Sequence, residues 1–190
     1  MDDLTTERGE RIKTMKFRIF IVNMDRFEAS TAEDKKATDF GEWFDLPITP
    51  NELGKVICET IGSSSNNGYK LLTTDCDIEE LSYFDDEVLY EVNEQAVMLD
   101  ETYLDSEQIL IVNALLSQAD DDLDEALSKI HRCVVYEDCD DEIDLGKAIA
   151  DRECLNYDCE FEDYIRWEDF VYDRCCGAYW FYEGCAIVEW

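Results

Sequence analysis

The sequence predicts an α+β fold in which a helical middle part lies between two parts that combine short strands with helices. Two observations carry this prediction. Segments rich in β-branched and aromatic residues, bounded by turn residues, occur near both ends of the chain and are typical of strands. The middle part instead places apolar residues at helical spacing, although it is also very acidic.

The N-terminal part opens with residues 1–14, which are polar and mixed in charge and are expected to form a loose tail. Residues 16–23, KFRIFIVN, alternate in a way that predicts a strand. We then expect a loop at 25–38, a strand at 39–47, a helix at 49–60, a loop at 62–68 and a strand at 69–73. The helix would begin after Thr49 as its N-cap, with Pro50 in the first turn.

Residues 75–144 form the most unusual stretch, with 24 Asp and Glu against Lys129 and Arg132, a net charge of −22. Disordered acidic tails lack aliphatic and aromatic residues, whereas here such residues are interleaved with the acids. Helices are predicted near 86–97, 105–118 and 121–130, each with an apolar stripe facing a core. The carboxylates would then form a fixed negative surface.

The C-terminal part is predicted to contain a short strand at 133–136 and helices at 142–153 and 160–173. The chain would end in a hairpin whose strands, 178–182 and 185–190, are joined by Glu183-Gly184.

The net charge of the whole chain is −32, far beyond the magnitude of roughly 2–8 that keeps a small domain soluble. Self-repulsion at this charge favours an elongated shape or the buried interface of a dimer. Such a surface disfavours nucleic acid and anionic membranes as direct partners. It favours basic proteins, cations, or a protein groove built for a polyanion.

The sequence shows no apolar run of signal-peptide or membrane-spanning length. It contains nine cysteines, an odd number. A reducing cytoplasm is therefore the expected location, with the cysteines acting mostly as small buried apolar residues.

Catalytic and zinc-binding patterns are weak. His131 is the only histidine, and its expected place is the carboxyl end of a helix, where it interacts favourably with the helix dipole. A single histidine gives no convincing nucleophile and base pair. His131, Cys133 and Cys139 also lack the C-x2-C spacing of zinc sites.

A calcium loop is also not expected. Asp75, Asp77 and Glu79 begin like an EF-hand, but Glu80 stands where that loop needs glycine for its sharp turn. We therefore predict no catalytic, cofactor-binding or metal-binding residues and no cofactor. An enzyme that uses Asp and Glu with a divalent cation is a third alternative.

The charge is comparable with that of a DNA duplex. B-DNA carries one negative charge per ~1.7 Å of axis. At that spacing a net charge of −32 matches about 54 Å of duplex, or about 16 base pairs. Acids three or four residues apart on a helix lie ~5–6 Å from one another at their Cβ atoms. A protein of this kind is able to occupy the DNA groove of an enzyme.

Three sets of residues resemble the ArdA antirestriction proteins, a family of acidic DNA mimics carried by mobile elements. The first is the strand at 17–23 followed by Gly41-x-Trp43-Phe44-x-Leu46-Pro47, and the second is the strand 71–74 running into Asp75. The third combines Leu145-Gly146 with Tyr164-Ile165, Glu168, Phe170 and Asp173. Together they cover roughly residues 15 to 190 in order. Trp167 departs from the family, which usually has an acid there, and the N-terminal tail is extra.

The resemblance implies an elongated row of three small subdomains, a homodimer, and no enzymatic activity. Applied to this chain, it gives an N-terminal α+β subdomain at 15–74, a central acidic helical subdomain at 75–131 and a C-terminal α+β subdomain at 132–190. The implied partners are the methyltransferase and specificity subunits of type I restriction-modification enzymes, whose DNA groove would be blocked. The main alternative is an acidic adaptor or chaperone that shields a basic nucleic-acid-binding protein.

The predicted site is a surface of many acids rather than a catalytic centre. The acids expected to form it are Asp75, Asp77, Glu79, Glu80, Asp85, Asp86, Glu87, Glu91, Asp120, Asp121, Asp122, Asp124, Glu125, Asp138, Asp140, Asp141 and Glu142. The aromatic residues expected at a dimer interface are Tyr164, Trp167, Phe170, Tyr179 and Trp180. For each of these aromatic residues, packing in the core of one chain is the simpler alternative.

Overall fold

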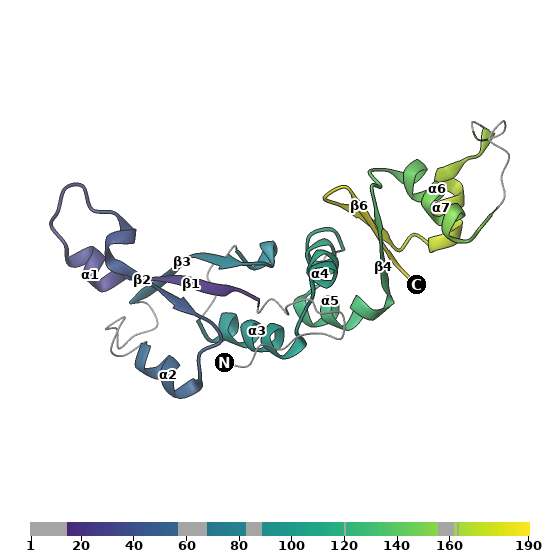
Figure 1. Ribbon diagram of the computed structural model, residues 1–190. Helices are drawn as coiled ribbons and strands as arrows, with labels where there is room; N and C mark the ends of the chain where they lie inside the picture. The colour runs from purple at the N-terminus through teal and green to yellow at the C-terminus, as the bar shows by residue number, and fades with distance from the viewer. Residues whose placement is uncertain (1–14, 57–67, 83–88, 120, 156–161, 163) are drawn as a thin grey trace. The chain divides into compact units, whose positions relative to one another are not determined.

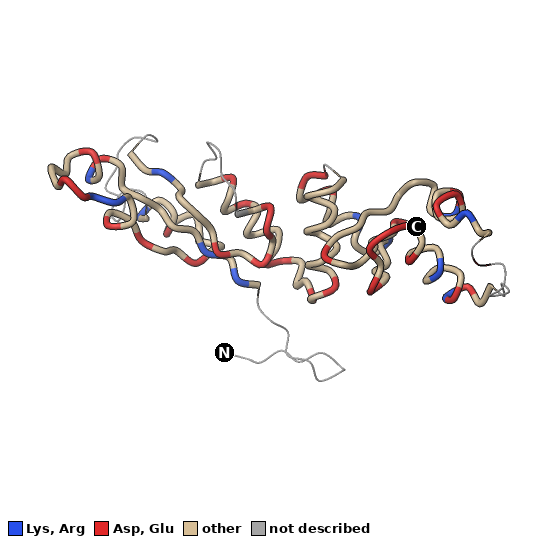
Figure 2. The backbone as a smooth tube through the Cα atoms, turned by 90° about the horizontal axis from the view of Figure 1, so that it is seen from above, with Lys and Arg blue, Asp and Glu red and all other residues tan. Residues whose placement is uncertain are grey.

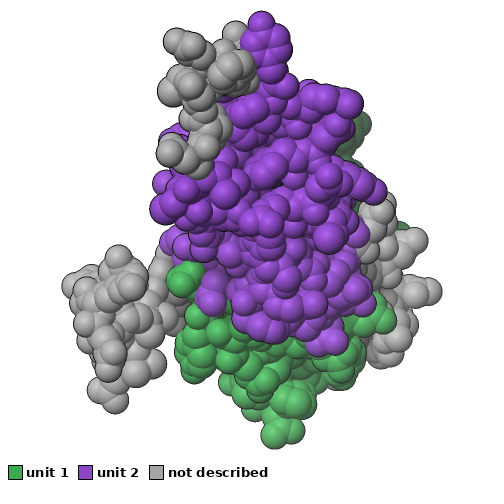
Figure 3. All heavy atoms as spheres, turned by 90° about the vertical axis from the view of Figure 1, so that its right-hand side faces the viewer, with its two compact units in different colours: residues 1–105 green, residues 106–190 purple. Residues whose placement is uncertain are grey.

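The computed structural model describes residues 15–56, 68–82, 89–119, 121–155, 162 and 164–190. These residues form seven α-helices and two three-stranded sheets, which confirms the predicted α+β class (Figure 1). The chain divides into two compact units, Met1–Asp105 and Ser106–Trp190, which Figure 3 distinguishes by colour. The division into three subdomains and their arrangement in a row remain predictions. The tail expected at 1–14 lies outside the described residues.

The sheet of unit 1 is antiparallel, with strand order β2-β1-β3. Its strands are β1 (Phe17–Asn23), β2 (Gly41–Asp45) and β3 (Tyr69–Cys76). The three strands predicted in this part of the sequence are therefore confirmed, with shifts at their ends. β1 is the central strand, and six of its seven residues are buried, because both of its edges and both of its faces are covered.

Two helices complete the core of unit 1. Helix α2 (Pro50–Lys55) begins after Thr49, whose hydroxyl accepts a hydrogen bond from the Glu52 amide, as the sequence predicts. The expected extension of α2 through 57–60 and most of the loop at 62–68 lie outside the described residues. Helix α3 (Leu89–Thr102) buries Leu89, Val92, Ala96 and Leu99, which share one face. It ends beyond the predicted 97, and 86–88 lie outside the described residues.

The loop predicted at 25–38 is partly wrong. Helix α1 (Met24–Ala29) begins there, and a 3₁₀ helix, η1 (Ala37–Phe40), closes the segment. The side chain of Asn23 caps α1 by accepting a hydrogen bond from the Arg26 amide at 2.8 Å. The rings of Phe27 and Phe40 meet edge to face with centroids 5.8 Å apart. This aromatic pair gives a mostly polar segment the apolar contact that orders it.

The sheet of unit 2 is also antiparallel, with strand order β4-β6-β5. It contains β4 (Cys133–Glu137), β5 (Tyr179–Tyr182) and β6 (Cys185–Glu189). The predicted C-terminal hairpin is confirmed. Its two turn residues have positive φ angles, 50° at Glu183 and 75° at Gly184, as a two-residue turn between twisted strands requires.

The helices of unit 2 match the sequence closely. They are α4 (Ser106–Gln118), α5 (Leu123–Lys129), η4 (Ile130–Arg132), α6 (Glu142–Arg152) and α7 (Trp167–Cys175). The predicted helix at 160–173 is wrong at its start, because Ile165 and Arg166 are not helical and α7 begins at Trp167. Residues 160, 161 and 163 lie outside the described residues. His131 is exposed in η4 at the carboxyl end of α5, where it was expected.

The core of unit 2 joins the sheet to α6 and α7 through residues such as Leu145, Ile149, Val171 and Val188. At Gly146 the two helices approach so closely that a Cβ atom would lie 2.6 Å from the Trp167 ring. None of the helices within the described residues is long and apolar enough to cross a membrane.

Candidate functional site

The predicted acidic surface divides into acids that the fold itself uses, acids that are exposed, and acids outside the described residues. The last group contains Asp85, Asp86, Glu87 and Asp120. In the described parts of both units, Asp and Glu lie on helices, strands and loops alike, and Lys and Arg are few (Figure 2). The contacts of each acid show how much of its charge is available to a partner.

Two acids cap helices. The carboxylate of Asp122 accepts a hydrogen bond from the Glu125 amide at 2.8 Å and begins α5. The carboxylate of Asp141 accepts bonds from the amides of Ile143 at 2.9 Å and Asp144 at 3.0 Å and begins α6. These acids satisfy amides that a helix leaves without partners in its first turn. Both residues remain exposed, so capping and surface charge coexist.

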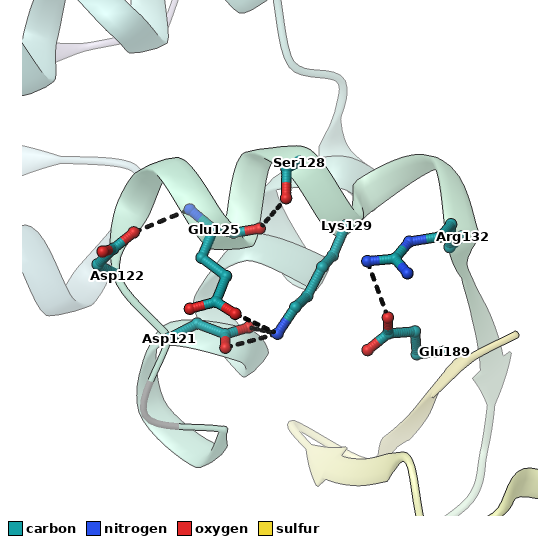
Figure 4. A network of polar contacts seen from close by, with 7 residues as sticks. All are labelled: Asp121, Asp122, Glu125, Ser128, Lys129, Arg132 and Glu189. Carbon is teal, nitrogen blue, oxygen red and sulfur yellow. Dashed lines mark hydrogen bonds and ion pairs between the residues drawn. The ribbon is translucent and has the colours of Figure 1, made fainter.

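Asp121 is bound inside unit 2 by Lys129 (Figure 4). The Lys129 ammonium donates to both carboxylate oxygens, at 2.7 and 2.9 Å, and lies 3.3 Å from a carboxylate oxygen of Glu125. The Asp121 side chain is only 6% exposed. The hydrogen bond from Lys129 to Asp121 is the main cause that raises the pKa of Lys129, so this ammonium stays charged. Asp121 therefore holds the turn before α5 and offers little charge to a partner.

Three further predicted acids have partners near by. Asp75 forms an ion pair with the Lys16 side chain, and the Lys16 amide donates to Asp77 at 3.2 Å. Both contacts join the end of β3 to the start of β1. In unit 2 the Tyr179 hydroxyl lies 3.4 Å from a Glu142 carboxylate oxygen. Burial, followed by the charge of Glu142, raises the pKa of Tyr179.

The remaining predicted acids are exposed on ordered backbone. Glu79 and Glu80 lie in the 3₁₀ helix η3 (Glu79–Ser82), Glu91 on α3 and Asp124 on α5. Asp138 and Asp140 are exposed in the turn between β4 and α6. These side chains, together with the exposed capping acids, are the part of the prediction that the structure places within reach of a partner.

Sequence reasoning missed exposed acids on α3, namely Glu94, Asp100 and Glu101. Asp100 and Glu101 lie in the last turn of the helix, which carries no basic residue. The negative end of the helix dipole disfavours acids there. A helical periodicity search would have found Glu94 and Glu101, since they lie three and ten residues after Glu91.

The cations of unit 2 are all engaged within the unit. Five of the six form ion pairs: Lys129 with Asp121 and Glu125, Arg132 with Glu189, Lys147 with Glu162, Arg166 with Asp169, and Arg174 with Glu153. The sixth, Arg152, lies over the Tyr136 ring with its guanidinium carbon 5.4 Å from the ring centroid. The 23 acids of this unit exceed its six bases by 17, so most of its acids have no basic counterpart in the unit.

The aromatic residues predicted at a dimer interface do not form one class. Trp167 is 5% exposed and packs against Gly146. It therefore belongs to the core of one chain, which was the simpler alternative to a dimer interface. Phe170, Tyr179 and Trp180 are half-buried, whereas Tyr164 is 81% exposed. The homodimer stays a prediction, and among these residues Tyr164 has the most surface to contribute.

The cysteines differ more in burial than the sequence suggests. Among the seven described cysteines, Cys139 and Cys175 are buried, Cys154 and Cys176 are exposed, and the other three are half-buried. Burial raises the pKa of Cys139 and of Cys175 to about 11. A thiol with a raised pKa is a poor nucleophile at neutral pH. The described residues contain no group of three or more His, Cys, Asp or Glu placed to hold a metal ion.

A cavity of about 660 Å³ in unit 2 is lined by Tyr136, Arg152, Glu107 and Glu137, among others. Cys185 also lines it, and burial raises the pKa of this thiol. The lining residues therefore include two carboxylates and a cation but no activated nucleophile. Comparison of the sequence with models of known protein families and with curated proteins found no match. The ArdA resemblance thus rests on the residues named above.

Proposed function

We propose that this protein is a non-enzymatic antirestriction protein of the ArdA type, which imitates the charge of B-form DNA. It would occupy the DNA groove of a type I restriction-modification enzyme, on the methyltransferase and specificity subunits, as a homodimer in the cytoplasm. The observation that carries the proposal is that all six cations of unit 2 have partners within the unit. The excess acids are left for an external set of cations.

The physical argument concerns where the charge lies. A solvated acidic tail would adapt to any basic surface and would have no fixed pattern. Here exposed acids lie on helices and structured turns, such as Asp124 on α5 and Asp140 before α6. A DNA groove binds phosphates through Lys and Arg at fixed positions. Acids on ordered backbone match such a groove with a smaller loss of conformational entropy than a flexible acidic shield.

The acids at the carboxyl end of α3 add support. Asp100 and Glu101 are exposed where the helix dipole opposes negative charge. Local stability would favour Lys or Arg at these positions. Residues that oppose local stability are expected mainly at functional sites. Unit 1 therefore also contributes acids whose positions are better explained by binding than by folding.

The first experiment is a competition titration. A type I methyltransferase is titrated with this protein in the presence of labelled duplex DNA, at several salt concentrations. The protein and the duplex should exclude one another, and affinity should fall as salt rises. The slope of log K against log salt should be shallower than for DNA, because folded carboxylates condense fewer counterions than phosphates. Simultaneous binding of both, or affinity independent of salt, would contradict the proposal.

Matched charge variants then test whether position matters. One variant replaces the exposed Asp124, Asp138 and Asp140 of unit 2 by Asn. The control neutralises three exposed acids of unit 1, Glu28, Glu33 and Asp34, which have Arg26, Lys35 and Lys36 near them in sequence. Each exposed pair contributes roughly 0.2–1 kcal/mol, so inhibition should decline gradually. The unit 2 variant should lose more affinity than the control. Equal losses would favour a general acidic shield for basic proteins.

A further inference from the structure

Unit 1 has an apolar groove that the acidic surface does not explain. The groove has a volume of about 400 Å³ and lies between the segment that enters α2 and one face of α3. Pro47, Pro50 and Leu53 line it from the α2 side, and Tyr90 and Val97 line it from α3. Its volume is within the range of sites that enclose a small ligand or an anchoring side chain.

The groove is held in shape by Asn93, a buried residue of α3. The Asn93 side chain accepts a hydrogen bond from the Ile48 amide at 2.7 Å and donates one to the Ile48 carbonyl at 3.0 Å. These two hydrogen bonds fix the segment between Pro47 and Pro50 against α3. A groove that is formed before binding loses little entropy when a partner enters it.

The wall contributed by α3 is exposed although it is apolar. Tyr90 is 55% exposed and Val97 is 37% exposed. Together with Glu94 they occupy positions i, i+4 and i+7, which lie on one face of a helix. Leu53, by contrast, is 1% exposed and belongs to the floor. The groove thus has a buried apolar floor, an exposed apolar wall, and a carboxylate on that wall.

The charge around the groove determines which occupant fits. Unit 1 has 25 acids and 10 bases, a net charge of −15. Glu94 lines the groove itself, and Glu52 lies on α2 in its first turn. The proposed dimer interface consists of aromatic residues of unit 2, so a second copy is not needed at this groove and would bring a further charge of −32 toward Glu94. Nucleic acid would also be repelled. A polypeptide segment that is both basic and apolar is attracted by the carboxylates and fills the groove.

We infer that this groove binds a bulky apolar side chain of a partner protein, presented by a segment with Lys or Arg on either side. The apolar side chain enters between Tyr90 and Leu53, and a neighbouring cation meets Glu94. Burial of the apolar side chain in the groove contributes affinity that salt does not screen. Attraction between the acids and the cations of the partner contributes affinity that salt does screen. This inference does not depend on the proposed function, since any basic partner protein could carry such a segment.

The test uses two short peptides rich in Lys and Arg that are identical except for a central Phe or Ala. Each is titrated into the ¹⁵N-labelled full-length protein, and binding is followed by amide shifts. Burial of the Phe side chain should make the Phe peptide bind about tenfold more tightly. The shifts that distinguish the two peptides should include Tyr90, Val97 and the Asn93 side-chain amide. Equal affinity of the two peptides would overturn the inference.

Variants sharpen the result. The double variant Tyr90→Ser and Val97→Ser should remove the preference for the Phe peptide and leave binding of the Ala peptide unchanged. Tyr172→Ala is the matched control, because Tyr172 of unit 2 is also exposed, at 63%, and lies outside the groove. A preference that persists in the double variant would overturn the inference. A different oligomeric state of the double variant, measured by light scattering, would also overturn the inference, because it would assign the groove to a second copy of the chain.

Discussion

Units 1 and 2 reach similar negative charge in different ways. Unit 1 carries a net charge of −15 over 105 residues, and unit 2 carries −17 over 85 residues. In unit 1 the cations Arg26, Lys36 and Lys70 are exposed at the surface, whereas Lys16 and Arg18 form ion pairs with Asp75 and Asp45. In unit 2 the cations are held in ion pairs or, at Arg152, over an aromatic ring.

Net charge alone does not measure the charge that a partner meets at the surface. An exposed cation reduces the negative field around it, whereas a cation bound to a partly buried carboxylate cancels a charge that the partner would not meet. In unit 2 this holds for Lys129 with Asp121, 16% and 6% exposed, whereas the exposed Arg166 pairs with an exposed Asp169 that a partner would also meet. Unit 1 combines a mixed surface with an apolar groove, so its interactions are expected to depend less on salt.

The largest effect is expected from Lys129 and Asp121, the least exposed of the ion pairs described in unit 2. Lys129→Met leaves the carboxylate of Asp121, 6% exposed, without its cation. We expect a loss of about 2 kcal/mol in the free energy of unfolding, between the roughly 0.2–1 of exposed pairs and the 3–5 of fully buried ones. This corresponds to a decrease of about 4–8 °C in Tm. Urea unfolding and calorimetry measure both quantities.

Two companions of Lys129→Met test the cause. Arg166→Ala breaks an exposed pair, with Arg166 81% and Asp169 56% exposed, and should cost at most about 1 kcal/mol. The double variant Asp121→Leu with Lys129→Met removes both charges and should recover most of the lost stability. If the double variant were as unstable as Lys129→Met, lost packing rather than an unpaired carboxylate would be the cause.

A smaller effect should separate capping from charge at Asp141. Asp141→Ala removes the acceptor for the amides of Ile143 and Asp144 and should cost about 1 kcal/mol. Asp141→Asn keeps an acceptor, because Asn caps helices about as well as Asp, and should change stability by only a few tenths of a kcal/mol. Chemical denaturation compares the two variants. Equal destabilisation would show that the negative charge, and not the cap, stabilises α6.

Much of the fold could be predicted because local signals agree with it. Thr49 and Pro50 identify the start of α2, and Glu183-Gly184 identifies the hairpin turn. Helix α1 was missed because its anchor is the contact between Phe27 and Phe40, which are thirteen residues apart in a polar segment. A contact of this kind is set by tertiary structure and leaves little local pattern.

The candidate site could be predicted only in part. The sequence identified the acids but gave no means to separate the partly buried Asp121 from the exposed Asp124, since both belong to one acidic run. That difference depends on Lys129, eight residues away on the following helix. The apolar groove was missed as well, because Pro47 and Tyr90 come from distant segments that Asn93 joins through Ile48.

Salt should affect the two units differently. Screening relieves self-repulsion, and unit 2 has more net charge on fewer residues than unit 1. Added salt should therefore slow amide exchange in β4 and β6 more than in β1 and β3, by an amount equivalent to about 1 kcal/mol or less. Native-state hydrogen exchange at low and moderate salt measures this difference. If salt slowed amide exchange more in β1 and β3 than in β4 and β6, self-repulsion would not be stronger in unit 2.

The smallest expected effect concerns Asp138, where stability and binding should move in opposite directions. Asp138 is exposed, has a φ angle of 55°, and is followed closely by Asp140 and Asp141. Asp138→Asn keeps a residue type that tolerates this backbone conformation and removes one charge from the cluster. Stability should rise by a few tenths of a kcal/mol, because repulsion falls and no cap is lost. Affinity for a type I methyltransferase should fall slightly at low salt, because the proposed mimic loses one charge.

The matched control is Glu33→Gln in unit 1, which should not gain stability, because its neighbours in sequence include Lys35 and Lys36. Urea unfolding and the duplex competition titration measure the two properties on the same samples. A loss of stability in Asp138→Asn would show that this carboxylate supports the turn, and unchanged affinity would remove Asp138 from the proposed binding surface.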